Sequence, residues 1–295
     1  MFVNFKNVVD SFHPKLPFGM GQIGKAFRNE ITPRDFIFRL RELEQMEIEY
    51  FVRPDDWKRA FEEWRVAMGT FIDLVGIDHT HTYEVEIGDA DRSFYSKRTI
   101  DFEFDYPFGQ KELYGLAYRT DYDLSKHTDG SKVDLSYFDE ESGERLTPHC
   151  IEPSFGLDRT ILAVLLSAYT EDNLGAKEGE EPRVFLKFHP RVAPIKVAVS
   201  PLLKNKPELV TKAREVYTML KSEVPQIMFD DNGNIGKRYR RQDEIGTPFC
   251  VVIDFDTLGE TPDLKDTVTI RDRDTGEQKR LPIAELINFI KKAIQ

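Results

Sequence analysis

The stretch FRNEITPRDFIFRLRELEQMEIEYF, residues 27–51, gathers arginines and carboxylates in two segments whose alternation predicts adjoining strands. In the first strand, Arg28 and Glu30 are expected to share one face. In its partner, one face would carry Arg39, Arg41, Gln45, Glu47 and Glu49. Guanidinium groups hold phosphates through paired hydrogen bonds, and carboxylates accept from an ammonium or an exocyclic amine. The pattern predicts a site for a ligand with anionic and cationic parts. The alternative is a solvated face of weak cross-strand ion pairs.

A second segment, CIEPSFGLDRTILAVLLSAY, adds groups of the same kind. An apolar strand would deliver Glu152 and Ser154, Gly156 permits a turn, and Arg159 falls in the first turn of an apolar helix. A cation at that position opposes the helix dipole, so local stability does not explain it. We expect Arg159 and the helix N-terminus to hold an anion such as a phosphate together.

The elements that position these groups follow from periodicity. Helical spacing predicts a helix within residues 53–77, on the residues Trp57, Phe61, Trp64, Met68 and Ile72. Residues 82–150 alternate in short runs, KVDLSYF among them, which predicts antiparallel strands with turns at HTDGS, residues 127–131, and DEESGE, residues 139–144. A helix follows at 157–169, and residues 170–183 are expected to form an exposed loop.

The last third of the chain changes to an alternation of strands and helices. Strands are expected within residues 194–203, 225–231, 249–255 and 266–274, and helices within 206–223 and 282–294. We therefore predict two domains, residues 1–190 and 191–295.

Composition excludes several classes of protein. The 295 residues are 40% hydrophobic and hold two cysteines, with no apolar run of membrane-spanning length and no secretory signal at the start. We expect no membrane association, no disulfide framework and a cytoplasmic location. No protein-bound zinc is expected, because His79 and His81 lack a further ligand and ordinary strand positions suit them better.

Charge is distributed unevenly along the chain. Residues 190–295 carry 18 Lys and Arg against 16 Asp and Glu, whereas residues 1–189 carry 23 against 36. The densest basic cluster is KRYRR, residues 237–241, where Tyr239 sits among four cations. This cluster is expected to meet the phosphates of a nucleic acid, and its alternative is a solvated helix face.

The sequence GMGQIG matches the glycine pattern of dinucleotide-binding proteins at Gly19, Gly21 and Gly24. That motif needs a strand before it and a helix after it, because the pyrophosphate sits at the N-terminus of the helix. Here a loop precedes the glycines and a strand-like run follows them. The match is therefore interpreted as coincidental.

Taken together, these segments resemble motifs 2 and 3 of the class II aminoacyl-tRNA synthetases, and specifically glycyl-tRNA synthetases of the homodimeric type. The resemblance rests on FRNE, EQMEIEYF, KELYGLAYRTDYDL, EPSFGLDR and IGKRYRRQDEIGTPFCVVIDFDT, which follow one another in the family's order. It implies an antiparallel α+β catalytic sheet flanked by helices, followed by an α/β anticodon-binding domain.

The resemblance also implies roles for single residues. Arg28 and Arg159 would be catalytic, and ATP would be bound by Arg28, Asn29, Glu30, Phe38, Arg39, Leu43, Glu112, Leu113, Gly156 and Arg159. Glycine would be bound by Leu43, Glu47, Glu152 and Ser154. Glu112 and Glu152 would hold the Mg²⁺ that accompanies ATP. Contacts with tRNA would come from Lys237, Arg238, Arg240 and Arg241.

The implied reaction is ATP-dependent activation of glycine and transfer to tRNA(Gly), in an enzyme that is a homodimer at full length. Two features depart from the family: Leu43 replaces a usual phenylalanine, and the chain starts after motif 1 and the RPETAQG segment. The sheet is thus expected to be incomplete at its N-terminal side. The alternatives are a non-catalytic, nucleic-acid-binding or accessory relative, and one half of a split synthetase.

Overall fold

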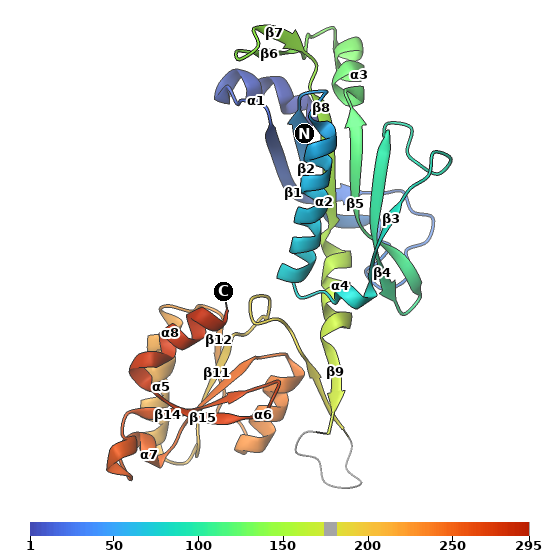
Figure 1. Cartoon of the computed structure of the whole chain (residues 1–295). Helices are drawn as coiled ribbons and strands as arrows, with labels where there is room; N and C mark the ends of the chain where they lie inside the picture. Colours follow the sequence, from blue (N-terminus) through green and yellow to red (C-terminus); the bar gives the residue numbers. More distant parts are fainter. Residues whose placement is uncertain (174–181, 295) are drawn as a thin grey trace. The chain divides into compact units, whose positions relative to one another are not determined.

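The computed structural model describes residues 1–173 and 182–294 and divides into two compact units (Figure 1). Unit 1 comprises Met1–Asp73 and Asp78–Ala163, and unit 2 comprises Leu74–Ile77 and Val164–Gln295. The predicted order of an antiparallel sheet followed by an α/β unit is confirmed. By compactness the division falls inside a helix after Ala163, so the boundary at residue 190 stays a prediction. In the described part of the chain, no helix is long and apolar enough to span a membrane.

Unit 1 is built on a six-stranded antiparallel sheet in the order β1-β2-β8-β5-β4-β3. Its strands are β1 (Phe18–Phe27), β2 (Glu42–Val52), β3 (Thr82–Glu86), β4 (Arg98–Tyr106), β5 (Gly109–Thr120) and β8 (His149–Gly156). Smaller elements are α1 (Phe5–Phe12), α3 (Tyr122–Ser131) and the hairpin of β6 (Tyr137–Asp139) and β7 (Glu144–Leu146). The predicted turn at DEESGE, residues 139–144, joins this hairpin and is confirmed.

One face of the sheet is covered by α2 (Trp57–Leu74), which lies along it in Figure 1. The helix buries its apolar side, including Phe61 and Met68, as its periodicity predicted. Across the interface Trp64 meets Tyr50 on β2, and Phe71 meets Phe155 on β8. Because side chains alternate along a strand, the neighbours of Tyr50 and Phe155 point to the opposite face.

Unit 2 contains a five-stranded sheet in the order β12-β11-β13-β14-β15. Its strands are β11 (Val197–Pro201), β12 (Ile227–Phe229), β13 (Phe249–Ile253), β14 (Thr267–Asp272) and β15 (Gln278–Pro282). β11 pairs in parallel with both β12 and β13, while β14 and β15 are antiparallel. The helices are α5 (Pro207–Lys221), α6 (Ile235–Glu244), α7 (Phe255–Leu258) and α8 (Ile283–Ala293). Valines and isoleucines of β11 and β13 form the core with α5 and α8.

The connection between the motifs and unit 2 runs through α4 (Leu157–Ala168), followed by an antiparallel pair of β9 (Tyr169–Asp172) and β10 (Arg183–Leu186). The predicted helix at 157–169 is confirmed. The predicted loop at 170–183 is wrong at both ends, because residues 170–172 and Arg183 pair as strands. Residues 173 and 182 lie outside the strands, and residues 174–181 lie outside the described residues.

Three further predictions require correction. The turn at HTDGS is the last part of α3, which ends where Lys132 adopts a left-handed backbone. Most of KVDLSYF precedes the short strand β6. In the opening stretch, β1 ends at Phe27 and β2 begins at Glu42, so Arg28, Glu30, Arg39 and Arg41 lie in the connection between the strands.

The three glycines of GMGQIG lie within β1 and no helix follows them directly, so the structure agrees that the dinucleotide match is coincidental.

Candidate active site

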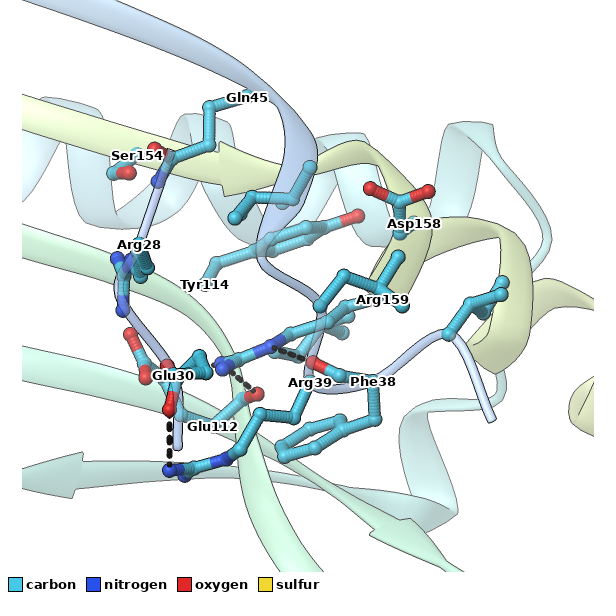
Figure 2. A pocket seen from close by; sticks show the side chains of 15 residues that line it. Arg28, Glu30, Phe38, Arg39, Gln45, Glu112, Tyr114, Ser154, Asp158 and Arg159 are labelled. Carbon is cyan, nitrogen blue, oxygen red and sulfur yellow. Dashed lines mark hydrogen bonds and ion pairs between the residues drawn. The ribbon is translucent and has the colours of Figure 1, made fainter. Parts of the chain in front are cut away.

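The face of the sheet opposite α2 carries a pocket at the end where β1, β2 and α4 meet (Figure 2). We call it the arginine pocket. It is lined by Arg28, Glu30, Ile37, Phe38, Arg39, Leu40, Leu43, Gln45, Glu112, Leu113, Tyr114, Ser154, Gly156, Asp158 and Arg159. Every residue predicted for ATP lines it except Asn29. Residues far apart in the sequence are therefore brought together as the motifs predicted.

The backbone between β1 and β2 is held by hydrogen bonds from one of its own arginines, Arg41. Arg41 donates from Nε to the carbonyl of Glu30 at 2.8 Å and from Nη2 to the carbonyl of Ile31 at 2.9 Å. Its guanidinium is therefore used to hold the loop. The sequence placed Arg41 on the ligand face, and the structure assigns it this supporting contact instead.

Two arginines in the pocket are paired with carboxylates that line it as well. Arg39 Nη1 lies 3.5 Å from Glu30 Oε2, and Arg159 Nη1 lies 3.0 Å from Glu112 Oε2. Arg159 also donates to the Glu112 carbonyl at 2.7 Å, and its guanidinium stacks 4.2 Å above the ring of Phe38. Figure 2 shows both ion pairs on the same side of the pocket. Among the described residues, Arg28 makes no side-chain hydrogen bond or ion pair, so its donors are free.

A second pocket adjoins the first and shares Arg28, Gln45, Glu112 and Ser154 with it. We call it the acidic pocket. Its carboxylates are Glu47, Asp91, Asp101, Glu112 and Glu152, against two arginines, Arg28 and Arg92. An ammonium group suits this excess of negative charge. Three residues predicted for glycine lie here, Glu47, Glu152 and Ser154, whereas Leu43 lines the arginine pocket.

Strand register explains how the acidic pocket forms. Glu47 on β2 stands opposite Ser154 on β8, Ser154 opposite Gly115 on β5, and Gly115 opposite Asp101 on β4. These four positions form one row across the sheet, on the face away from α2. A side chain at Gly115 would meet the carboxylate oxygens of Glu112 at 3.6 Å and Asp101 at 3.9 Å. The glycine therefore leaves the row open between its carboxylates.

Carboxylates on this face titrate unusually. Burial, followed by the nearby Glu152, raises the pKa of Glu49 to about 7, while a hydrogen bond from Cys150 Sγ at 3.0 Å opposes the rise. Burial also raises the pKa of Asp101 to about 6, with Glu112 adding to it. The pKa of Glu152 is raised by burial against the effect of Arg119. The face accumulates more negative groups than it can ionise together without a large energetic penalty.

Arg119 on β5 is a residue that sequence reasoning missed. It donates to both oxygens of Asp123, at 2.7 and 2.9 Å, and to Glu152 Oε2 at 2.7 Å. Its guanidinium lies 4.0 Å from the ring centre of Tyr95. Arg119 therefore fixes the orientation of Glu152. The i,i+4 spacing of Arg119 and Asp123 within YRTDYDL was the signal that could have revealed it.

The metal prediction concerned Glu112 and Glu152, which both line the acidic pocket. Within the described ranges, no cluster of three or more His, Cys, Asp or Glu side chains could hold a metal ion. Magnesium usually takes one or two carboxylates and completes its shell with water and substrate phosphates. The two glutamates fit that pattern if Glu112 leaves Arg159. His79 and His81 pair with Asp73 and Asp105 respectively in a short 3-10 turn, not in a strand.

The basic cluster on α6 divides into two kinds of side chain. Arg238 is only 2% exposed, and it donates to the carbonyls of Pro201, Asp231 and Gly233. Arg241 forms a bidentate pair with the buried Asp230. The sequence treated Lys237, Arg238, Arg240 and Arg241 alike. The structure corrects this, because Lys237 and Arg240 are exposed while Arg238 supports the fold.

Comparisons with known proteins give a consistent result. Residues 4–168 match the family described as "tRNA synthetase class II core domain (G, H, P, S and T)", and residues 196–293 match "Anticodon binding domain". The chain is 48% identical over 295 residues to a glycine–tRNA ligase of Clostridium tetani and 46% identical over 318 residues to one of Thermus thermophilus. All of this chain is covered, against 61% and 62% of those relatives. The chain thus spans less than two thirds of their length.

Proposed function

Because this chain belongs to the family of class II tRNA synthetase core domains, we propose that it carries the ATP and glycine sites of a glycine–tRNA ligase. The observation that supports this most is the adjacency of the two pockets. Three arginines, Arg28, Arg39 and Arg159, line one pocket, and the carboxylates Glu47 and Glu152 line the next. Such a pair of pockets suits a polyphosphate beside an ammonium.

In the proposed reaction, Arg28 binds the α-phosphate of ATP, since it lines both pockets and its donors are free. Arg39 and Arg159 bind the terminal phosphates after exchanging Glu30 and Glu112 for phosphate oxygens. Phe38, held at 5.1 Å from both Tyr106 and Phe108, gives the nucleotide an apolar surface. Mg²⁺, when bound, neutralises phosphate charge, and Glu112 with Glu152 would hold it.

Glycine is bound through its ammonium by Glu47 and Glu152, with Ser154 between them. Its carboxylate attacks the α-phosphorus in line, pyrophosphate leaves, and the glycyl adenylate passes its acyl group to a terminal hydroxyl of tRNA(Gly). The protein forms no covalent intermediate in this scheme. Its contribution is position and charge stabilisation. Glycine selectivity would come mainly from exclusion of larger side chains.

The α/β unit is proposed to bind the anticodon arm of tRNA(Gly). Support comes from its match to an anticodon-binding family and from the exposed cations Lys237 and Arg240. A cytoplasmic location and a homodimer at full length complete the proposal. Because the relatives are longer, these statements concern the whole enzyme to which this chain corresponds in part.

The test is ATP–pyrophosphate exchange with glycine, on the purified chain alone and with a polypeptide carrying the family's motif 1 and RPETAQG segments. We expect weak or no exchange alone and restored exchange in the mixture, because a further glutamate beside the amino acid would complete its binding. Exchange that stays absent in the mixture, together with tight RNA binding, would favour the non-catalytic alternative.

A further inference from the structure

The loop between β3 and β4, residues 87–97, forms one wall of the acidic pocket. Arg92 and Tyr95 line the pocket from this loop. The loop is fixed at both ends, because the Ile87 amide donates to the Thr99 carbonyl at 2.9 Å and the Lys97 amide donates to the Tyr118 carbonyl at 2.9 Å. The side chains of the loop therefore have a defined place over the pocket.

Tyr95 connects this loop to the residue that orients Glu152. Its ring lies 4.0 Å from the guanidinium of Arg119, which in turn donates to Asp123 and Glu152. The strong donors of Arg119 are occupied by these two carboxylates. Arg119 can bind a substrate anion only by breaking the hydrogen bonds that hold the pocket together.

Arg92 is in the opposite situation. Its side chain is 18% exposed, whereas its only ion-pair partner among the described residues, Asp89, is 92% exposed. A pair of this kind, three residues apart and open to water, contributes little. A guanidinium has five N–H donors. Arg92 therefore holds a cation with most of its donors available at the wall of a pocket that is rich in carboxylates.

We propose that Arg92 binds the carboxylate of the amino-acid substrate while Glu47 and Glu152 take its ammonium. The inference rests on the proposed function. An amino acid is a zwitterion, and the acidic pocket has two arginines to match its anionic end, Arg28 and Arg92. Arg28 also lines the arginine pocket, where phosphate would occupy it. Arg92 is left as the cation that orients the carboxylate.

This role predicts a specific kinetic pattern. The carboxylate carries its full charge before activation and becomes part of a mixed anhydride afterwards, so the contact is strongest in the ground state. Loss of Arg92 should therefore raise the KM for glycine more than it lowers kcat. A purely structural loss would change the affinity for every ligand of the pocket.

The experiment measures binding by calorimetry to the chain mixed with the polypeptide that carries the motif 1 and RPETAQG segments, in the presence of a saturating non-hydrolysable ATP analogue. The ligands are glycine and glycinamide, which keeps the ammonium and lacks the carboxylate. The variants are Arg92→Ala, Arg92→Lys and, as a matched control in the same loop, Asp89→Asn. We expect Arg92→Ala to weaken glycine binding by roughly ten- to a hundredfold and glycinamide binding by less than about twofold. Asp89→Asn should bind glycine as well as the wild type or better.

Each contrary result is decisive. Unchanged glycine binding in Arg92→Ala, or equal loss of glycine and glycinamide, overturns the proposal. Equal affinity of the wild type for the two ligands does so too, because no carboxylate is then being recognised. If the mixture binds the ATP analogue but neither ligand, the Arg92 assignment fails while the nucleotide site stands. If it binds neither the ATP analogue nor glycine nor glycinamide, both the proposed function and the Arg92 assignment are wrong.

Discussion

In the arginine pocket, Arg159 on α4 forms an ion pair with Glu112 on β5. Arg159 Nη1 lies 3.0 Å from Glu112 Oε2 and 2.7 Å from the Glu112 carbonyl oxygen. The pair neutralises a cation that opposes the dipole of its own helix. A polyphosphate offers a stronger partner than a single carboxylate, since it brings more negative oxygens. The pair is thus a contact that ligand binding would replace.

Arg159→Ala should reduce glycine-dependent ATP–pyrophosphate exchange by roughly 10²–10³-fold in the reconstituted enzyme, the scale of removing one preorganised charged donor. Arg159→Lys should recover only part of it, because an ammonium lacks the bidentate fork. Arg59→Ala, at an exposed arginine on α2, is the control and should leave exchange unchanged. Normal exchange in Arg159→Ala would remove this residue from the site.

Glu49→Gln should make unit 1 more stable at pH 8 and change it little at pH 4.5. Burial lifts the folded-state pKa of Glu49 from 4.5 to about 7, so the folded chain binds a proton that the unfolded chain releases. Its contribution is fully present below about pH 4.5 and is lost as the pH rises through about 7. The difference is on the order of 3 kcal/mol.

Denaturant unfolding at the two pH values measures this effect. Both tryptophans, Trp57 and Trp64, lie on α2, so their fluorescence reports unit 1 alone. Glu63→Gln on the exposed side of α2 serves as the control. If the stability difference between Glu49→Gln and the wild type were the same at both pH values, the pKa of Glu49 would not be raised in the folded state.

Lys237→Ala with Arg240→Ala should weaken binding of an anticodon stem-loop RNA. The slope of log affinity against log salt should become shallower by about two, because each substitution removes one cation that neutralises a phosphate. Fluorescence anisotropy at several salt concentrations measures it. The pair Lys265→Ala and Lys292→Ala, also exposed in unit 2, should leave the slope unchanged. Equal effects of the two double variants would show that the RNA reads only the overall charge.

Asp243→Ala should destabilise unit 2 by about 3–5 kcal/mol, because it leaves the buried Arg271 without its anion. Asp243 is 2% exposed and accepts from Arg271 at 2.8 and 3.0 Å and from Arg183 at 3.1 Å. The adjacent Glu244 pairs with Arg240 at the surface. Glu244→Ala is therefore the matched control, with an expected loss below about 1 kcal/mol. Thermal unfolding followed by circular dichroism compares the two, and similar losses would contradict the buried network.

Sequence reasoning succeeded where periodicity and local chemistry agree. The helix α2 and the parallel strands β11 and β13 have strong apolar patterns, and each was predicted at nearly its observed position. It failed where tertiary contacts, and not the local sequence, determine the secondary structure. The HTDGS segment has turn-forming residues yet continues α3, and the polar ends of 170–183 pair as strands.

The same division holds in the site. The family resemblance implied ten of the fifteen residues that line the arginine pocket. It could not show that Arg41 and Arg238 donate to backbone carbonyls, since the acceptors lie in other segments or in turns. It also missed Arg92, which reaches the acidic pocket from the β3–β4 loop, and Arg119, which reaches Glu152 from β5.

The chain crosses from unit 1 to unit 2 inside the helix α4, so neither unit can be cut out at a linker without loss of its own residues. Unit 2 takes in the end of α4 and the β9–β10 pair, and Arg183 on β10 supplies one of the charges that compensate Asp243. Excision at residue 190, where the sequence pattern changes, would remove Arg183 and the carbonyl of Phe188 that accepts from Arg273 at 2.8 Å. A graft of this anticodon-binding unit onto another enzyme would therefore need to include the second half of the motif 3 helix. Exchange of the unit by recombination would then join two chains within a helix and not within a flexible linker.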